Sequence, residues 1–191
     1  MVIVNLITLI GGVGLIVMSL WPGYAGGCVV LLALPVMALL GLAWFFTATR
    51  ALPPPWGTGA NVRVSRVLIA PVLVCTTFAM LRYYVPRRVG FLAHERAFER
   101  LLPSAPSAGA STPTPLGRRV GIYSVDEWAT DLRGGVYFRT GTGPDGLGPD
   151  TMSYGFAHQP NRQGSPFGAA HYAVRRLFGD WYWFRASNDW F

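Results

Sequence analysis

The chain of 191 residues contains no lysine, because all sixteen of its basic residues are arginine. Arginine binds phosphate and carboxylate groups through two parallel hydrogen bonds, so one interpretation is anion recognition. The other is compositional, since a GC-rich genome favours the codons of arginine, alanine, glycine and proline together. The arginines are scattered along the chain, which favours the compositional interpretation.

Cysteine is nearly absent, and both Cys28 and Cys75 fall in apolar stretches. This placement excludes the paired-cysteine framework of a small secreted domain. The run Ala25-Gly26-Gly27-Cys28 is similar to a bacterial lipoprotein cleavage site, but the preceding residues lack the basic region of a signal peptide. We therefore expect Val2–Leu20 to be retained as a helix.

Charge is missing from three long apolar runs in the first 85 residues. Val2–Leu20 has 19 residues, Cys28–Thr49 has 22, and Val67–Leu81 has 15 before Arg82. A helix needs about 20 residues to cross the hydrocarbon of a bilayer, and an arginine at the end of a span can reach the headgroups. The sequence thus predicts three transmembrane helices within residues 1–85, and with them a multi-pass membrane protein.

Positive charge is concentrated in the first part of the chain. Residues 1–117 hold eight arginines against two acids, whereas residues 118–191 hold eight arginines against seven acids. Nucleic-acid binding needs a basic stripe on a folded surface, so we expect no nucleic acid as a partner. Basic side chains beside an apolar span attract anionic lipid headgroups, and this predicts a lipid bilayer as a partner. The candidate headgroup-binding residues are Arg82, Arg87 and Arg88.

No catalytic constellation is visible in the sequence. His94-Glu95 begins like the zinc motif HExxH, but Phe98 stands where that motif requires its second histidine. His158 and His171 are far from His94 in the sequence, and no cysteine follows residue 117 to complete a zinc site. The apolar runs carry no histidine or acid for haem ligation or proton transfer. The sequence therefore predicts neither an enzyme nor a bound cofactor.

Three segments follow the apolar region. Residues 86–102 have the spacing of an amphipathic juxtamembrane helix, and the uncharged, proline-rich residues 103–117 indicate a flexible linker. Residues 118–191 predict a small all-β antiparallel domain, which we expect to be a five-stranded meander with Gly179-Asp180 as its last hairpin turn. The expected strands are Val120–Val125, Gly135–Thr140, Met152–His158, His171–Phe178 and Trp181–Ser187.

The stretch Gly141–Thr151 contains a doubled Gly-Pro-Asp. Asp145 and Asp150, with nearby backbone carbonyls, are candidate ligands for Ca²⁺, which binds six to eight oxygens. Their spacing does not follow the EF-hand pattern. The favoured interpretation is a hairpin loop in which proline, glycine and aspartate set the turns.

Aromatic residues crowd the last eleven positions of the chain. Trp181, Trp183, Trp190 and Phe191 lie there, with Arg185 among them. One interpretation is the core of a small domain. The other is an exposed patch that docks on a partner, because tryptophan, tyrosine and arginine dominate the binding energy of interfaces. We name these five residues as the candidate partner-binding site.

The sequence also carries a resemblance, over residues 67–191. The segments Tyr84–Phe91 and Ala97–Arg100, followed by Gly134–Phe138 and Ser153–Phe156, resemble small membrane-anchored proteins of GC-rich bacteria. The resemblance implies an anchored C-terminal domain outside the cytoplasm and implies no activity.

These features together suggest a non-catalytic accessory or scaffold subunit of a membrane protein assembly, docking through its aromatic-rich β-domain. The alternative is a membrane-anchored sensor that binds Ca²⁺ or a small ligand at residues 141–151. The expected location is the bacterial plasma (inner) membrane. The arginines closest to the spans, together with the resemblance, favour a C-terminal domain outside the cytoplasm.

Overall fold

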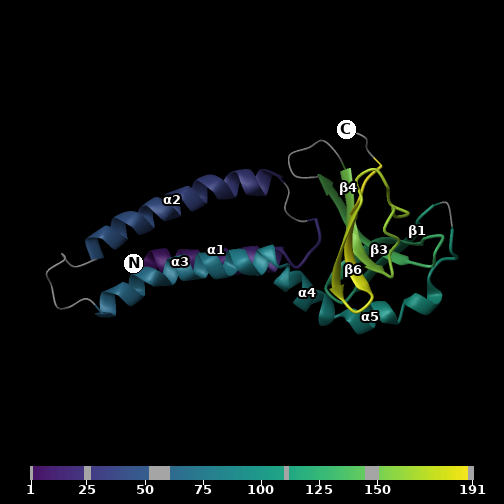
Figure 1. The fold of residues 1–191 in the computed structure, drawn as a ribbon, viewed down its shortest axis with the longest axis horizontal. Helices are drawn as coiled ribbons and strands as arrows, with labels where there is room; N and C mark the ends of the chain where they lie inside the picture. The colour runs from purple at the N-terminus through teal and green to yellow at the C-terminus, as the bar shows by residue number, and fades with distance from the viewer. Residues whose placement is uncertain (1, 24–26, 52–60, 110–111, 145–150, 189–191) are drawn as a thin grey trace. The chain divides into compact units, whose positions relative to one another are not determined.

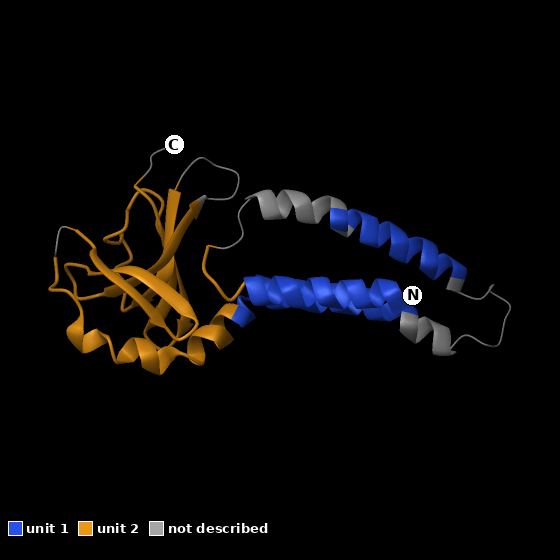
Figure 2. Ribbon diagram, turned by 180° about the vertical axis from the view of Figure 1, so that it is seen from behind, with its two compact units in different colours: residues 1–18, 28–86 blue, residues 19–27, 87–191 orange. Residues whose placement is uncertain are grey.

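The computed structural model describes residues 2–23, 27–51, 61–109, 112–144 and 151–188. The chain divides into two compact units, which are coloured separately in Figure 2. Unit 1 comprises Met1–Met18 and Cys28–Pro86, and unit 2 comprises Ser19–Gly27 and Arg87–Phe191.

Unit 1 is built from α1 (Val2–Met18), α2 (Gly27–Ala51) and α3 (Asn61–Arg82). α1 and α3 lie side by side, as Figures 1 and 2 show. Gly12 of α1 lies so close to α3 that a Cβ atom added to it would be 2.8 Å from the hydroxyl of Thr77. α2 is tied to α3 by a hydrogen bond of 2.9 Å from the Trp44 indole to the carbonyl of Val67.

The described helices contradict the three predicted spans. α1 ends at Met18 and has 17 residues, which gives about 25 Å of helix against about 30 Å of hydrocarbon. Within the described residues no single helix is long and apolar enough to cross a bilayer, although Val67–Arg82 and Val85–Leu92 meet that requirement together as a bent pair. The predictions of three transmembrane helices, of a multi-pass membrane protein and of a location in the bacterial inner membrane are therefore wrong.

Unit 2 contains a six-stranded antiparallel sheet with the strand order β1-β2-β3-β4-β6-β5 (Figure 1). Short runs rich in valine, tyrosine, phenylalanine and tryptophan form most of these strands, because such side chains pack well on a pleated surface. The strands are β1 (Thr114–Val120), β2 (Tyr123–Thr130), β3 (Val136–Pro144), β4 (Thr151–His158), β5 (Ala173–Phe178) and β6 (Trp181–Ala186).

The sheet differs from the expected five-stranded meander in two ways. The expected strand Val120–Val125 spans the turn between β1 and β2, so the sheet has one strand more. β6 pairs with β4, and β5 therefore lies at the edge of the sheet. The predicted turn at Gly179-Asp180 is confirmed, since Phe178 faces Trp181 and Gly179 has the positive φ of +50° that favours glycine there.

One face of the sheet is covered by helices of the same unit. α4 (Val85–Leu92) enters unit 2 at Arg87 and is followed by α5 (Glu95–Glu99) and the 3₁₀ turn Leu102–Ser104. Phe91 and Phe98 from these helices are fully buried and pack on Phe156 at ring-centroid distances of 4.8 and 5.5 Å. The apolar side of residues 86–102 thus completes the larger of the cores of unit 2.

The opposite face of the sheet is covered by the connection between β4 and β5, residues 159–172. Phe167 of this connection stacks on Phe184 of β6, with ring centroids 5.8 Å apart and an interplanar angle of 19°. Tyr137 of β3 packs edge-on against the same Phe184 ring at 5.3 Å. Because both faces of the sheet are covered, strand β6 carries aromatic side chains on both of its sides.

Candidate functional site

The strand predicted to dock a partner is an interior strand of the sheet. Trp181 of β6 is 2% exposed and its ring centroid lies 5.1 Å from that of Phe91. Trp183 is 8% exposed, and the guanidinium of Arg87 lies 4.6 Å above its ring. The structure thus places both tryptophans in the core, which is the first of the two interpretations of the aromatic cluster.

Three further residues belong to the predicted docking site. Arg185 is half-buried on β6, and Trp190 and Phe191 lie outside the described residues. A docking surface on unit 2 therefore has to be sought among side chains other than Trp181 and Trp183.

The candidate calcium ligands Asp145 and Asp150 also lie outside the described residues. The strands on either side of them are described: β3 ends at Pro144, β4 begins at Thr151, and these two residues are paired. The stretch thus joins two neighbouring strands, which is the position expected of a hairpin loop. Among the described residues no three histidine, cysteine, aspartate or glutamate side chains gather as metal ligands would.

The three arginines predicted to bind lipid headgroups have different surroundings. Arg82 and Arg88 are exposed, whereas Arg87 is half-buried over the Trp183 ring. Burial raises the pKa of Tyr123 to about 12, and the positive charge of Arg87 opposes this rise. Arg87 thus contributes to the packing of unit 2 through its stem and its charge.

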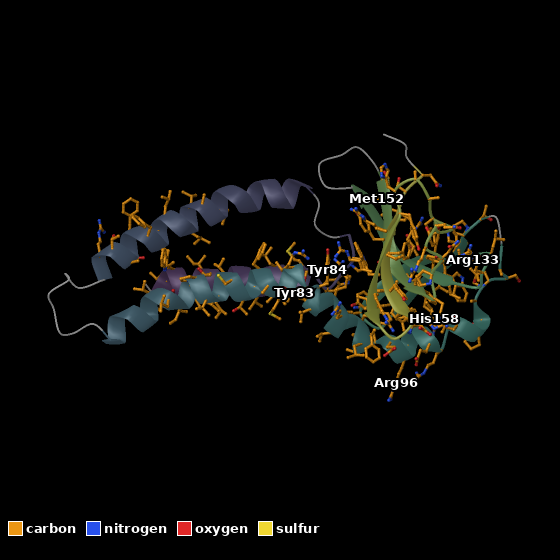
Figure 3. The ribbon with its side chains drawn as sticks, viewed as in Figure 1. Tyr83, Tyr84, Arg96, Arg133, Met152 and His158 are labelled. Carbon is orange, nitrogen blue, oxygen red and sulfur yellow. The ribbon has the colours of Figure 1, made fainter. Side chains whose placement is uncertain are left out.

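A network of buried polar groups lies at the turn between β2 and β3. The carboxylate of Asp131, which is 8% exposed, accepts hydrogen bonds from the backbone N–H groups of Arg133 (2.8 Å) and Gly135 (2.9 Å) on Oδ1. On Oδ2 it accepts one from the Tyr137 hydroxyl (3.1 Å) and one from the backbone N–H of Asn161 (3.2 Å). Figure 3 labels Arg133 at this end of the sheet.

The same network holds the connection 159–172 over the sheet. The backbone N–H of Asn161 donates to the Tyr137 hydroxyl at 2.8 Å, and the Tyr172 hydroxyl donates to the carbonyl of Asn161 at 2.6 Å. Burial, aided by the hydrogen bond to Tyr172 and the charge of Asp131, raises the pKa of Tyr137 far above its ordinary value. Burial likewise raises the pKa of Tyr172 to about 12.

These pKa shifts limit the chemistry that the network can perform. A tyrosine acting as a general base or nucleophile needs a lowered pKa, and those of Tyr137 and Tyr172 are raised. Both side chains remain neutral hydrogen-bonding groups at physiological pH. The network therefore orients the connection 159–172, and its geometry is that of a structural clamp.

A second charged cluster lies on the same face as Phe167. The Arg139 guanidinium pairs with Asp126 and with Glu127, at 3.0 Å in each case. It also lies 5.4 Å from the centroid of the Phe167 ring. Arg139 is thus engaged on several sides within unit 2, and its arrangement stabilises the packing of the connection.

The two edges of the sheet differ in how they could receive a further strand. β1 carries Pro115, an irregularity of register between Pro115 and Arg118, and Gly117 with a positive φ of +55°. Proline and bulges prevent further pairing at an edge. At the other edge, β5 pairs regularly with β6 from Ala173 to Arg176.

Strand β5 carries two basic, exposed side chains. Arg175 and Arg176 follow one another, so they point to opposite faces of the sheet, and Phe178 is 56% exposed at the end of the strand. His171 and Ser187 exchange two backbone hydrogen bonds. The pairs Ala173–Arg185 and Arg175–Trp183 follow at intervals of two residues along the same two strands. Antiparallel pairing alternates, so the intervening backbone groups of β5 point away from β6.

Comparison of the chain with protein-family models, with curated proteins and with solved structures finds no match. The resemblance to small membrane-anchored proteins of GC-rich bacteria therefore stays a prediction.

Sequence reasoning missed both Asp131 with its tyrosine partners and the edge position of β5. The segment Asp131–Gly135, an aspartate followed by a Gly-Gly pair between two β-type runs, is the pattern of a turn capped by a carboxylate, so Asp131 could have been found. Tyr172 could not, because only the path of the connection over the sheet brings it to Tyr137.

Proposed function

We propose that this protein is a non-catalytic accessory protein whose β unit docks an extended, acidic segment of a partner protein along strand β5. The observation that carries the proposal is the contrast between the two sheet edges. β1 is blunted by Pro115 and by a break in its register, whereas β5 pairs regularly from Ala173 to Arg176 and its register shifts only between Arg176 and Phe178, at the end of the strand.

The charge of β5 selects the kind of partner. Its sequence, Ala-Val-Arg-Arg-Leu-Phe, has two arginines and no acid, and both arginines are exposed. Two copies of β5 would place like charges opposite one another, which disfavours pairing of this edge with itself. An acidic strand, in contrast, gains opposite-charge pairs on both faces in addition to main-chain hydrogen bonds.

The size of β5 sets the length of the partner segment. The six residues of β5, of which Ala173–Arg176 are regularly paired, match an incoming strand of about four to six residues, which is a usual strand length in globular proteins. Phe178, at the end of the strand, adds an exposed apolar contact at one end of such a segment. We therefore expect the partner segment to carry two consecutive glutamates opposite Arg175 and Arg176, flanked by valine or threonine, and to bear an apolar residue near Phe178.

The test uses the full chain and a fluorescent peptide in which two consecutive glutamates are flanked by valine and threonine, with binding followed by anisotropy. The variant Arg175→Glu/Arg176→Glu should bind at least about tenfold more weakly, because like charges across an interface cost several kcal/mol. The matched control is Arg118→Glu/Arg119→Glu, which reverses two exposed arginines on the β1 edge and should leave the affinity unchanged.

A second probe separates strand addition from simple charge attraction. The same peptide, N-methylated at alternate residues so that one edge cannot donate hydrogen bonds, should lose its binding to β5. Equal binding of the methylated peptide, or an equal loss in the two charge-reversed variants, would contradict the proposal.

A further inference from the structure

In unit 1, small and polar residues lie at several of the helix contacts, and many large apolar side chains are exposed. On α1, Gly12 lies against Thr77 of α3, and the Asn5 side-chain oxygen is buried. On the other side of the same helix, Ile3 is 71% exposed and Ile10 is 63% exposed.

The other two helices also combine buried small residues with exposed large apolar ones, and Val67 of α3 is buried as well. On α3, Ala70 is buried while Phe78 is 68% exposed. On α2, Ala48 is buried while Leu39 is 67% exposed.

This pattern is the reverse of the one that water produces. In water, burial of large apolar side chains drives packing, and exposed apolar patches larger than a few hundred Å² are rare. In hydrocarbon no such drive exists between helices, so small residues form the helix contacts and large apolar residues face outward. The close contact between Gly12 and Thr77 is of the kind that helices form in hydrocarbon.

The charge of this part of the chain also favours a lipid environment. No acidic residue precedes Glu95, whereas six arginines do. Arg50 lies in the last turn of α2 and Arg82 in the last turn of α3, and both are exposed. A second copy of the chain would bring the same positive charge, whereas anionic phospholipid headgroups complement it.

We propose that the outward faces of α1, α2 and α3 bind a lipid surface, with acyl chains against the large apolar side chains and anionic headgroups at Arg50 and Arg82. Contact of these faces with lipid requires no single membrane-spanning helix, because a helix can also bind a bilayer while lying in the plane of its interface. The proposal concerns unit 1 and is independent of strand β5.

The experiment uses the full chain, with Cys28→Ser and Cys75→Ser, and one nitroxide-labelled cysteine at a time at position 10, 78, 70 or 96. Vesicles of phosphatidylcholine with phosphatidylglycerol are added, and collisions with oxygen and with a water-soluble nickel chelate are measured. Labels replacing Ile10 and Phe78 should become accessible to oxygen and shielded from nickel. The label replacing Ala70 should remain shielded from both, and the label replacing exposed Arg96, which Figure 3 marks, should stay accessible to nickel.

Two outcomes would overturn the proposal. Accessibility to nickel at positions 10 and 78 would show that water covers these faces, and shielding from both reagents would show that a protein does. A circular dichroism spectrum identical to that of the parent protein confirms in each case that the labelled chain is folded.

The binding of anionic headgroups at Arg50 and Arg82 is measured separately. The variant Arg50→Gln/Arg82→Gln should partition onto the anionic vesicles about fivefold less per arginine removed, and equally onto vesicles of phosphatidylcholine alone. Equal partition of variant and parent onto the anionic vesicles would overturn the assignment of anionic headgroups to these two arginines.

Discussion

The hydroxyl of Tyr137 donates a hydrogen bond to Oδ2 of Asp131 across 3.1 Å, and it accepts one from the backbone N–H of Asn161 across 2.8 Å. A single hydroxyl thus links the β2–β3 turn, strand β3 and the connection that covers the sheet. Because Tyr137 is fully buried, no solvent is available to replace these hydrogen bonds when they are removed.

We predict that Tyr137→Phe lowers the free energy of unfolding by about 1–3 kcal/mol, since it leaves a buried carboxylate oxygen and a backbone N–H without this partner. Chemical denaturation of the full chain, followed by the near-ultraviolet circular dichroism of unit 2, measures the change. Tyr182→Phe, which makes the same chemical change on half-buried Tyr182 of β6, is the control and should cost much less. An equal cost in both variants would mean that the network adds nothing.

Asp131→Asn should destabilise unit 2 by about 2–3 kcal/mol, because the carboxylate accepts four hydrogen bonds and an amide nitrogen cannot accept any. Amide exchange should show where the loss occurs, with faster exchange at Asn161 and Gly135. The control Asp180→Asn, at the exposed β5–β6 turn, should leave both amides as protected as before.

Stability should fall at alkaline pH, because burial raises the pKa values of tyrosines in the folded state. In the folded chain Tyr123 and Tyr172 have pKa values of about 12, against an ordinary value of 10.0. The folded state therefore holds these protons more tightly, so their contribution is fully present below about pH 10 and is lost as the pH rises from 10 towards 12. Denaturant titrations across this window measure it, and Tyr172→Phe should make the fall less steep. A stability that is independent of pH between 10 and 12 would contradict the prediction.

The sequence predicted the elements of unit 2 better than their arrangement. Alternating runs such as Met152–His158 correspond closely to β4, since their side chains alternate between two buried faces. β1 was missed because Thr114–Val120 contains proline, glycine and two arginines, and it becomes a strand only by pairing with β2. The edge position of β5 was missed because local patterns do not reveal where the connection 159–172 crosses the sheet.

The end of helix α1 could not be predicted from the sequence. An uncharged run of 19 residues does not make a helix of that length, because α1 ends at Met18 and Ser19–Gly27 belong to unit 2. Trp21 donates a hydrogen bond to the carbonyl of Ile122 at 3.4 Å within that unit. Such a contact depends on the fold of a segment a hundred residues away, so composition alone could not place the end of the helix.

Strands β3 and β4 approach one another closely at Gly155. A Cβ atom added to Gly155 would overlap the backbone carbonyl of Phe138 on the neighbouring strand and would lie 2.9 Å from the Phe184 ring. Gly155→Ala should therefore force these strands apart at the break in register near Arg139 and Gly141, at a cost of about 1–3 kcal/mol or more. Gly143→Ala is the matched control, because a Cβ atom there has no neighbour closer than 3.5 Å. Thermal unfolding of the two variants should show a markedly lower midpoint for Gly155→Ala alone. Equal midpoints would mean that the strands separate without cost, and the tight packing around Phe138 would then not determine the stability of unit 2.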